Sequence, residues 1–268
     1  MMNPRSTGGK IVQPYTDDEF NLFRAASSGN ISIVERLLEM GVSSSVLING
    51  FSAVHISIKK NNLEVVKRLM DHDSSLALST TADGRTCSML ASFEGHLDIL
   101  KFLCNQINND IEKLDREGND ALHYSCWGGH IECAKYLIEE KGFLVTRENR
   151  EGMVPMQYAC AGNHSNLVKY LSDIADSEQN RSSHQRSVTG MSSIHRAAMH
   201  GAIDTIRILL NADASLKNTR NSNNSTPLHL AVQHNYFDIV RLLVEHFDAD
   251  VQASNDYGLT PLHLACIG

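Results

Sequence analysis

The chain has 268 residues, of which 42% are hydrophobic and 21% charged, as in an ordinary globular protein. Its 24 Lys and Arg against 31 Asp and Glu give a formal net charge of −7. This balance argues against nucleic acid or an anionic membrane surface as the main partner, because phosphate binding needs clustered basic side chains. No apolar run approaches the roughly 18 residues of a membrane helix, so we expect no membrane insertion.

The first 20 residues contain no apolar segment like that of a signal peptide. We therefore expect the cytoplasm as the location, with the nucleus as the alternative. The six cysteines are then expected to be reduced thiols. Residues 1–15 are expected to form a flexible tail ahead of the first predicted helix.

An internal repeat runs along the chain. The phrase TPLHLA occurs twice, at Thr226–Ala231 and at Thr260–Ala265, 34 residues apart. With this Thr as an anchor position, matching anchors occur upstream at intervals of 32 to 38 residues. They are Phe20, Ser52, Thr86, Asp120, Val154 and Ser192. The anchors predict seven full repeats and an eighth that stops after one helix.

Fixed offsets from the anchor carry fixed residue types. Position +5 is always small: Ala25, Ser57, Ala91, Ser125, Ala159, Ala197, Ala231, Ala265. Position +9 is Gly or Asn: Gly29, Asn61, Gly95, Gly129, Asn163, Gly201, Asn235. Position −2 is also Gly or Asn from the second repeat on: Gly50, Gly84, Gly118, Gly152, Gly190, Asn224, Gly258. Position +17 is always Leu: Leu37, Leu69, Leu103, Leu137, Leu171, Leu209, Leu243. Because Gly and Asn enter the left-handed conformation readily, each repeat is predicted as a turn, a short helix, a break and a second helix with one apolar face.

In chain order, the first predicted helix begins after Thr16, where Glu19 three residues later completes a capping box. The repeats then span approximately 16–48, 49–80, 81–114, 115–148, 149–186, 187–220, 221–254 and 255–268. The longest interval contains a polar stretch, 176–190, which we expect to be a longer, mobile loop within one array. The last repeat ends at Gly268 before its second helix, so we expect the natural protein to continue.

The period of about 33 residues with the motif T-P-L-H-x-A resembles the ankyrin-repeat family, from about Thr16 to Gly268. The match is complete in the two TPLHLA segments and degenerate in the other repeats. The resemblance implies an all-α solenoid of helix-turn-helix units joined by short β-hairpin or turn loops. It also implies a non-enzymatic, monomeric module that binds a partner protein or peptide on its concave face. The alternative is the recognition arm of a larger multidomain protein, such as an adaptor, channel, kinase or ubiquitin-ligase component, continuing past residue 268.

Four potential metal ligands occur within eleven residues: His123, Cys126, His130 and Cys133. Each falls on an offset (+3, +6, +10, +13) that other repeats fill with equivalent residues. Zinc needs four ligands that converge at ~2.0–2.3 Å, whereas the first two lie on one predicted helix, the third lies next to the helix break and the fourth lies on the second helix. We therefore expect no metal ion and no cofactor, with a zinc or redox protein as the alternative. The chain also contains no phosphate-binding, zinc-protease, nucleophile-elbow or dinucleotide motif, so we expect no enzyme.

The repeat does not explain one group of aromatic residues. Trp127, the only tryptophan, and Phe93 occupy position +7, which the fold does not need to be apolar, and Tyr124 and Tyr158 occupy position +4. The loop tips nearby carry polar and apolar residues: Arg85, Arg116, Glu117, Arg150, Glu151 and Met153. An aromatic anchor within a polar rim is typical of an interface hot spot, so these ten residues are the predicted partner-binding site. The alternative is that Trp127 only packs against the neighbouring repeat.

Overall fold

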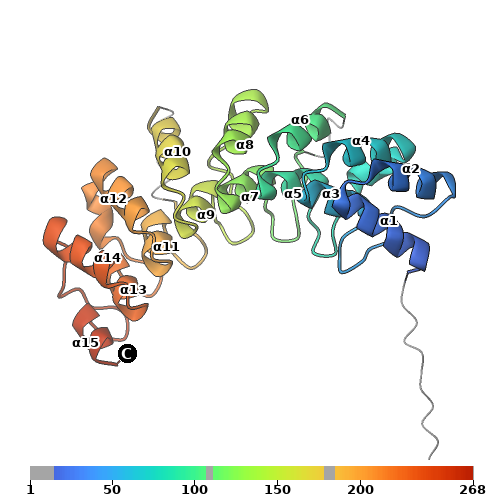
Figure 1. The fold of residues 1–268 in the computed structure, drawn as a ribbon. Helices are drawn as coiled ribbons and strands as arrows, with labels where there is room; N and C mark the ends of the chain where they lie inside the picture. Colours follow the sequence, from blue (N-terminus) through green and yellow to red (C-terminus); the bar gives the residue numbers. More distant parts are fainter. Residues whose placement is uncertain (1–14, 107–110, 178–184, 268) are drawn as a thin grey trace, which may run out of the picture. The chain divides into compact units, whose positions relative to one another are not determined.

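The structure, a computed structural model, describes residues 15–106, 111–177 and 185–267. It consists of two compact bodies, Met1–Ala82 and Asp83–Gly268, each of which is a stack of helix pairs. Most of the predicted N-terminal tail, residues 1–14, lies outside the described residues. Figure 1 shows the helices in chain order.

The N-terminal body contains two helix pairs. They are α1 (Asp17–Ser28) with α2 (Ile31–Glu39), and α3 (Ala53–Lys59) with α4 (Leu63–His72), followed by a 3-10 turn, η1 (Ser74–Leu78). The predicted capping box at the start of α1 is confirmed. The Glu19 N–H donates to Thr16 Oγ1 at 3.2 Å, and the Thr16 N–H donates to Glu19 Oε2 at 2.6 Å.

The C-terminal body continues the same alternation of first and second helices. Its pairs are α5 (Cys87–Glu94) and α6 (Leu97–Gln106), α7 (Ala121–Gly128) and α8 (Ile131–Lys135), α9 (Pro155–Ala161) and α10 (Ser165–Ser177), α11 (Ser193–Met199) and α12 (Ile203–Ala212), and α13 (Pro227–Gln233) and α14 (Phe237–Arg241), with α15 (Pro261–Ile267) last. Helices α8 and α14 continue as π-helical turns, η2 (Tyr136–Glu140) and η5 (Leu242–His246), and a 3-10 turn, η4 (Ala214–Asn218), follows α12. In Figure 1 the first helices α5, α7, α9 and α11 lie side by side, and α6, α8, α10 and α12 form a second row.

The Gly and Asn positions have the backbone conformation that the sequence predicted. All seven residues at +9 have φ between 56° and 78°, and all seven at −2 have φ between 56° and 89°. At Gly129 space is a second constraint, since an added Cβ would lie 2.3 Å from Nδ1 of His164. These residues end the first helices and close the loops between repeats.

The leucines at position +17 form the centre of the core. The seven leucines at +17 are between 0% and 7% exposed, and the small residues at +5 in the seven helix pairs are buried as well. Ile33 departs from the predicted pattern, because it is 46% exposed at position +13, where Val65, Ile99 and Leu167 are buried. No described helix precedes α1, so Ile33 lacks the neighbouring surface that buries the same position elsewhere.

Within the described ranges there is no β-strand, only isolated bridge residues such as the pair Ile48 and Phe51, so the all-α solenoid class is confirmed. The connecting loops are turns whose tips hydrogen bond to the next tip, as when the Arg150 N–H donates to the Glu117 carbonyl at 2.9 Å. Helix α10 extends to Ser177, two residues into the predicted polar loop, and residues 178–184 of that loop lie outside the described residues. None of the described helices is long and apolar enough to cross a membrane.

Candidate functional site

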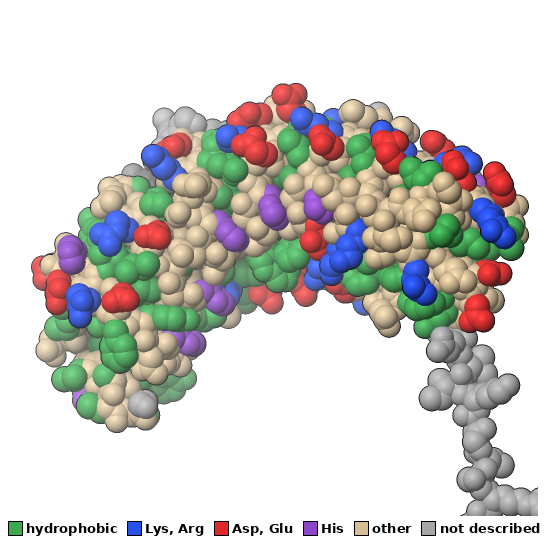
Figure 2. Space-filling model, in the orientation of Figure 1, with side chains coloured by type: hydrophobic (Ala, Val, Ile, Leu, Met, Phe, Trp, Pro, Cys, Tyr) green, Lys and Arg blue, Asp and Glu red, His purple; other side chains and the backbone are tan. Residues whose placement is uncertain are grey.

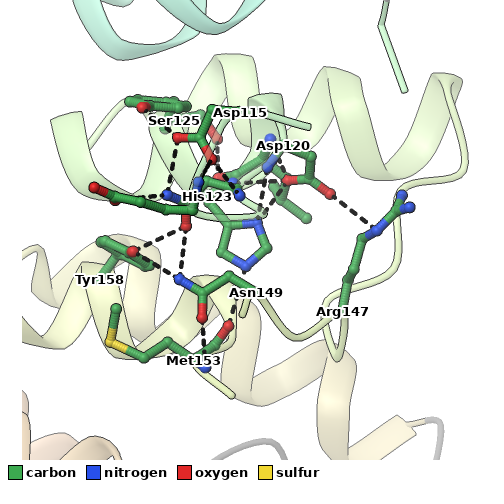
Figure 3. Close-up of polar contacts among 12 residues, drawn as sticks. Asp115, Asp120, His123, Ser125, Arg147, Asn149, Met153 and Tyr158 are labelled. Carbon is green, nitrogen blue, oxygen red and sulfur yellow. Dashed lines mark hydrogen bonds and ion pairs between the residues drawn. The ribbon is translucent and has the colours of Figure 1, made fainter. Parts of the chain in front are cut away.

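The first of the four potential metal ligands, His123, is buried and holds two loops together (Figure 3). Its Nδ1 lies 2.8 Å from Asp120 Oδ1, and its Nε2 lies 3.2 Å from the carbonyl oxygen of Met153. His195 and His229 make the same pair of contacts in their repeats, to the anchor side chain and to a carbonyl 30 residues further along the chain. The +3 histidine thus joins successive repeats, and we call this contact pair a histidine clamp.

The other three ligands are also used separately. Cys126 and Cys133 are buried, and burial raises the pKa of both thiols, that of Cys133 to about 11. His130 hydrogen bonds to the carbonyl of Phe93, and burial lowers the pKa of its imidazole. Across the described ranges, no group of three or more His, Cys, Asp or Glu side chains is placed to hold a metal ion. The spacing of these His and Cys residues therefore reflects their positions in the repeat.

The structure brings the four predicted aromatic residues together on three consecutive first helices, α5, α7 and α9. The Trp127 ring is the centre of this aromatic cluster. Its centroid lies 5.5 Å from that of Phe93, 5.9 Å from that of Tyr124 and 5.7 Å from that of Tyr158. Phe93 meets Trp127 edge to face, with an interplanar angle of 74°, and Tyr124 stacks on Trp127 at 27°. Both arrangements are favourable for aromatic pairs.

Members of the aromatic cluster differ in their access to solvent. Trp127 is 42% exposed, Phe93 and Tyr158 are half-buried, and Tyr124 is only 3% exposed. The Tyr124 hydroxyl donates to Asp115 Oδ2 at 2.7 Å, which fixes its ring beneath the cluster. Although burial raises the pKa of Asp115, hydrogen bonds from Tyr124 and Asn119 lower it below its usual range. Tyr124 therefore supports Trp127 from inside the body, and Trp127 faces outward.

The second tyrosine is fixed by amide side chains (Figure 3). The Tyr158 hydroxyl donates to Asn119 Oδ1 at 2.9 Å and accepts from Asn149 Nδ2 at 3.0 Å. Asn149 also donates to Asn119 Oδ1 at 2.8 Å, so three residues from two loops and a helix form one network. We missed this network from sequence, although its signal was present. Position −5 is Asp or Asn in four repeats (Asp115, Asn149, Asn221, Asn255), and in each its side chain accepts N–H groups of its own turn.

Arg85 covers one side of the aromatic cluster. Its guanidinium carbon lies 5.7 Å from the ring centroid of Phe93, 5.2 Å from that of Tyr124 and 5.8 Å from that of Trp127. These distances are within the range of cation–π attraction. Arg85 Nε also lies 2.8 Å from a carboxylate oxygen of Asp83, so the guanidinium is held in place from behind.

The remaining predicted residues lie at the loop tips of the repeats that carry the aromatic cluster. Arg116, Glu117, Arg150 and Glu151 are exposed, and Met153 is half-buried. In Figure 2, histidine side chains form a row across the C-terminal body, below Lys, Arg, Asp and Glu side chains that gather over α6 and α8. The tips thus carry charges of both signs beside an exposed aromatic ring.

Next to Trp127 lies an open hollow of about 430 Å³ in the C-terminal body. Its lining includes apolar residues, Trp127, Met153 and Tyr158, and basic residues, His164, Arg196 and His200. Arg196 and His200 were not among the predicted site residues. The available signal was that Arg196 stands at position +4, where the two preceding repeats carry Tyr124 and Tyr158.

Comparison with family models gives four overlapping matches to ankyrin repeats, at residues 22–115, 106–183, 145–218 and 194–268. Comparison with curated proteins gave no significant match. Ankyrin repeats are general protein–protein interaction modules, and the family is typically non-enzymatic. The matches extend from residue 22 to residue 268 and coincide with the helix pairs, so this chain belongs to the ankyrin-repeat family.

Proposed function

We propose that the chain is a non-enzymatic interaction module that binds a protein or peptide through the loop tips and first helices of the C-terminal body, its concave face, with Trp127 as the anchor. One observation carries the proposal. All six residues of α7 from Ala121 to Cys126 are buried, whereas Trp127, the largest side chain of the helix, is 42% exposed. A helix that buries its other side chains and leaves a tryptophan accessible is suited to recognition.

The surroundings of Trp127 support the same role. Tyr124, Tyr158 and Arg85 hold the indole by ring contacts and are themselves held by hydrogen bonds or an ion pair. An anchor that is already ordered loses little conformational entropy when it binds. The charged tips around it supply the polar rim that specific interfaces have.

The proposal is tested by replacing the anchor with alanine. Tagged wild-type protein, Trp127→Ala and Gln233→Ala are compared as baits, and the affinity of each captured protein is then measured with purified components. Gln233 is the matched control, because it is an exposed residue at the same offset, +7, on α13. We expect Trp127→Ala to weaken binding by ~2 kcal/mol or more, roughly thirtyfold, with little change in melting temperature. If Trp127→Ala lowers the melting temperature and the folded variant binds as wild type does, Trp127 is a packing residue and the proposed site is wrong.

A further inference from the structure

The hollow beside Trp127 is lined by both apolar and basic residues. Trp127, Tyr158 and Met153 line a space of about 430 Å³ together with His164, Arg196 and His200. The residues that line it include no Asp or Glu. A ligand group that enters it therefore meets a ring surface and a guanidinium together.

Arg196 differs in its ion pairs from the two other arginines whose Nε is buried without a hydrogen bond. Its Nε is buried and has no hydrogen-bond acceptor among the described residues. Arg85 and Arg68 Nε have no hydrogen bond either, but each lies close to a carboxylate, at 2.8 Å from Asp83 and 3.0 Å from Glu35. No such ion pair joins Arg196 to a described carboxylate. The positive charge of the Arg196 guanidinium is therefore not balanced by a described carboxylate, and an anion that enters the hollow would supply the missing counter-charge.

The positive charge of Arg196 affects a second residue that lines the hollow. The pKa of His200 is lowered first by burial and then by the positive charge of Arg196. An imidazole with a lowered pKa is uncharged at neutral pH, so the positive potential of the hollow at that pH comes from Arg196.

We propose that this hollow takes the carboxylate of an Asp or Glu side chain from the bound peptide, paired with the Arg196 guanidinium, beside an apolar residue that packs on Trp127. The inference rests on the proposed function, since it names the peptide chemistry that the same surface selects. A single guanidinium matches a carboxylate in charge and fork geometry, whereas a phosphate dianion favours several cations. Apolar and basic residues line the same hollow, so we place the acidic residue and the apolar residue close together in the peptide.

The test uses the whole chain and a defined probe, a phage-displayed library of random heptapeptides. Peptides selected on the wild-type protein are synthesised with their acidic residue, with its amide isostere and with phosphoserine in its place. Dissociation constants are measured by fluorescence anisotropy against wild type, Arg196→Gln, Arg207→Gln and Trp127→Ala. Arg207, exposed on α12 of the same helix pair, is the matched control, because its replacement removes the same charge.

We expect selected peptides to carry Asp or Glu beside an apolar residue. Both Arg196→Gln and the amide isostere should weaken binding about tenfold or more, and Arg207→Gln should change it less than about threefold. The isostere leaves the protein unaltered, so this result does not depend on how Arg196→Gln folds.

The outcomes separate the two proposals. Peptides that need Trp127 but lack an acidic residue and ignore Arg196→Gln would overturn the carboxylate site and leave the proposed function standing. Phosphoserine peptides that bind more than tenfold tighter than their Asp or Glu forms would also overturn it, in favour of a phosphopeptide site. Selection that yields no peptide dependent on Trp127 would overturn both.

Discussion

Replacing Asp120 with threonine should stabilise the protein. Asp120 is fully buried at the N-cap of α7, and its Oδ1 accepts from the N–H groups of Leu122 and His123, each at 3.0 Å. Its Oδ2 has no hydrogen bond among the described residues, and the nearest cation, Arg147 Nε, is 3.8 Å away (Figure 3). The carboxylate therefore carries one buried oxygen that is poorly satisfied.

Threonine at the same offset in other repeats keeps the contacts to the +3 residue, whereas the bond from the Leu122 N–H is lost. At Thr226 the hydroxyl lies 2.8 Å from His229 Nδ1, and at Thr86 it accepts the Met89 N–H at 3.3 Å. The substitution removes an unsatisfied buried oxygen, which costs ~1–3 kcal/mol. It also removes a long ion pair to an arginine side chain that is 40% exposed, which contributes about 0–1 kcal/mol. The balance is a gain of about 1 kcal/mol, or ~2–4 °C in melting temperature for a chain of this size.

Thermal and urea unfolding of Asp120→Thr, followed by circular dichroism, would measure this gain. Arg147→Gln is the matched control, because it removes the distant cation and leaves the carboxylate in place. It should destabilise wild type by less than about 1 kcal/mol and have no effect in the Asp120→Thr background. If Asp120→Thr instead lowers the melting temperature by several degrees, the buried pair of Asp120 and His123 is net stabilising and the reasoning fails.

Two further substitutions test the core and the histidine clamps. Leu137→Ala should lower the free energy of unfolding by ~2–5 kcal/mol in urea titrations, because Leu137 is fully buried between repeats; a loss under 1 kcal/mol would contradict the +17 leucines as the centre of the core. Burial lowers the pKa of His195 to about 4 from 6.5. Between these values the unfolded chain binds a proton that the folded chain does not, so stability should fall by up to roughly 3 kcal/mol as the pH drops from 6.5 to 4. His195→Gln should reduce that loss in melting curves taken across this range, since Gln157 at the same offset already bonds three backbone groups. An unchanged pH profile would show that His195 does not cause the loss.

The sequence was sufficient to predict the repeat, because the residue types at its fixed offsets are required by backbone geometry and packing. Gly and Asn at +9 and −2 all have positive φ, and the leucines at +17 are all buried, so those predictions are confirmed. These requirements are local to each helix pair and its neighbours, which is why one chain displays them seven times. Ile33 shows the limit of this prediction. The burial of position +13 depends on a preceding helix pair, which the sequence of the repeat itself does not reveal.

The candidate site was only partly predictable, for a different reason. Position +7 identified Phe93 and Trp127 as unexplained by the fold, and the structure places them in contact. The extent of their exposure depends on how neighbouring repeats pack and on bonds such as that from Tyr124 to Asp115, which recurs at Tyr158 and Asn149 but was not recognised in the sequence. Arg196 was missed because its significance lies in the acceptor that its Nε lacks, and that is a property of the packed structure.

These observations also explain why recognition and stability can be separated in this fold. On α7 the small, capping and core residues are all committed to contacts within the body, and only Trp127 combines a large apolar surface with access to solvent. Tyr124 lies one turn earlier and is committed twice, to Asp115 by a hydrogen bond and to Trp127 by stacking. Removing Tyr124 would disturb both the body and the anchor, so its effect on binding could not be assigned. Removing Trp127 deletes ring contacts to its neighbours but leaves the hydrogen bonds of Tyr124 and Tyr158 in place. A loss of binding without a loss of folding can therefore be attributed to the surface that Trp127 forms.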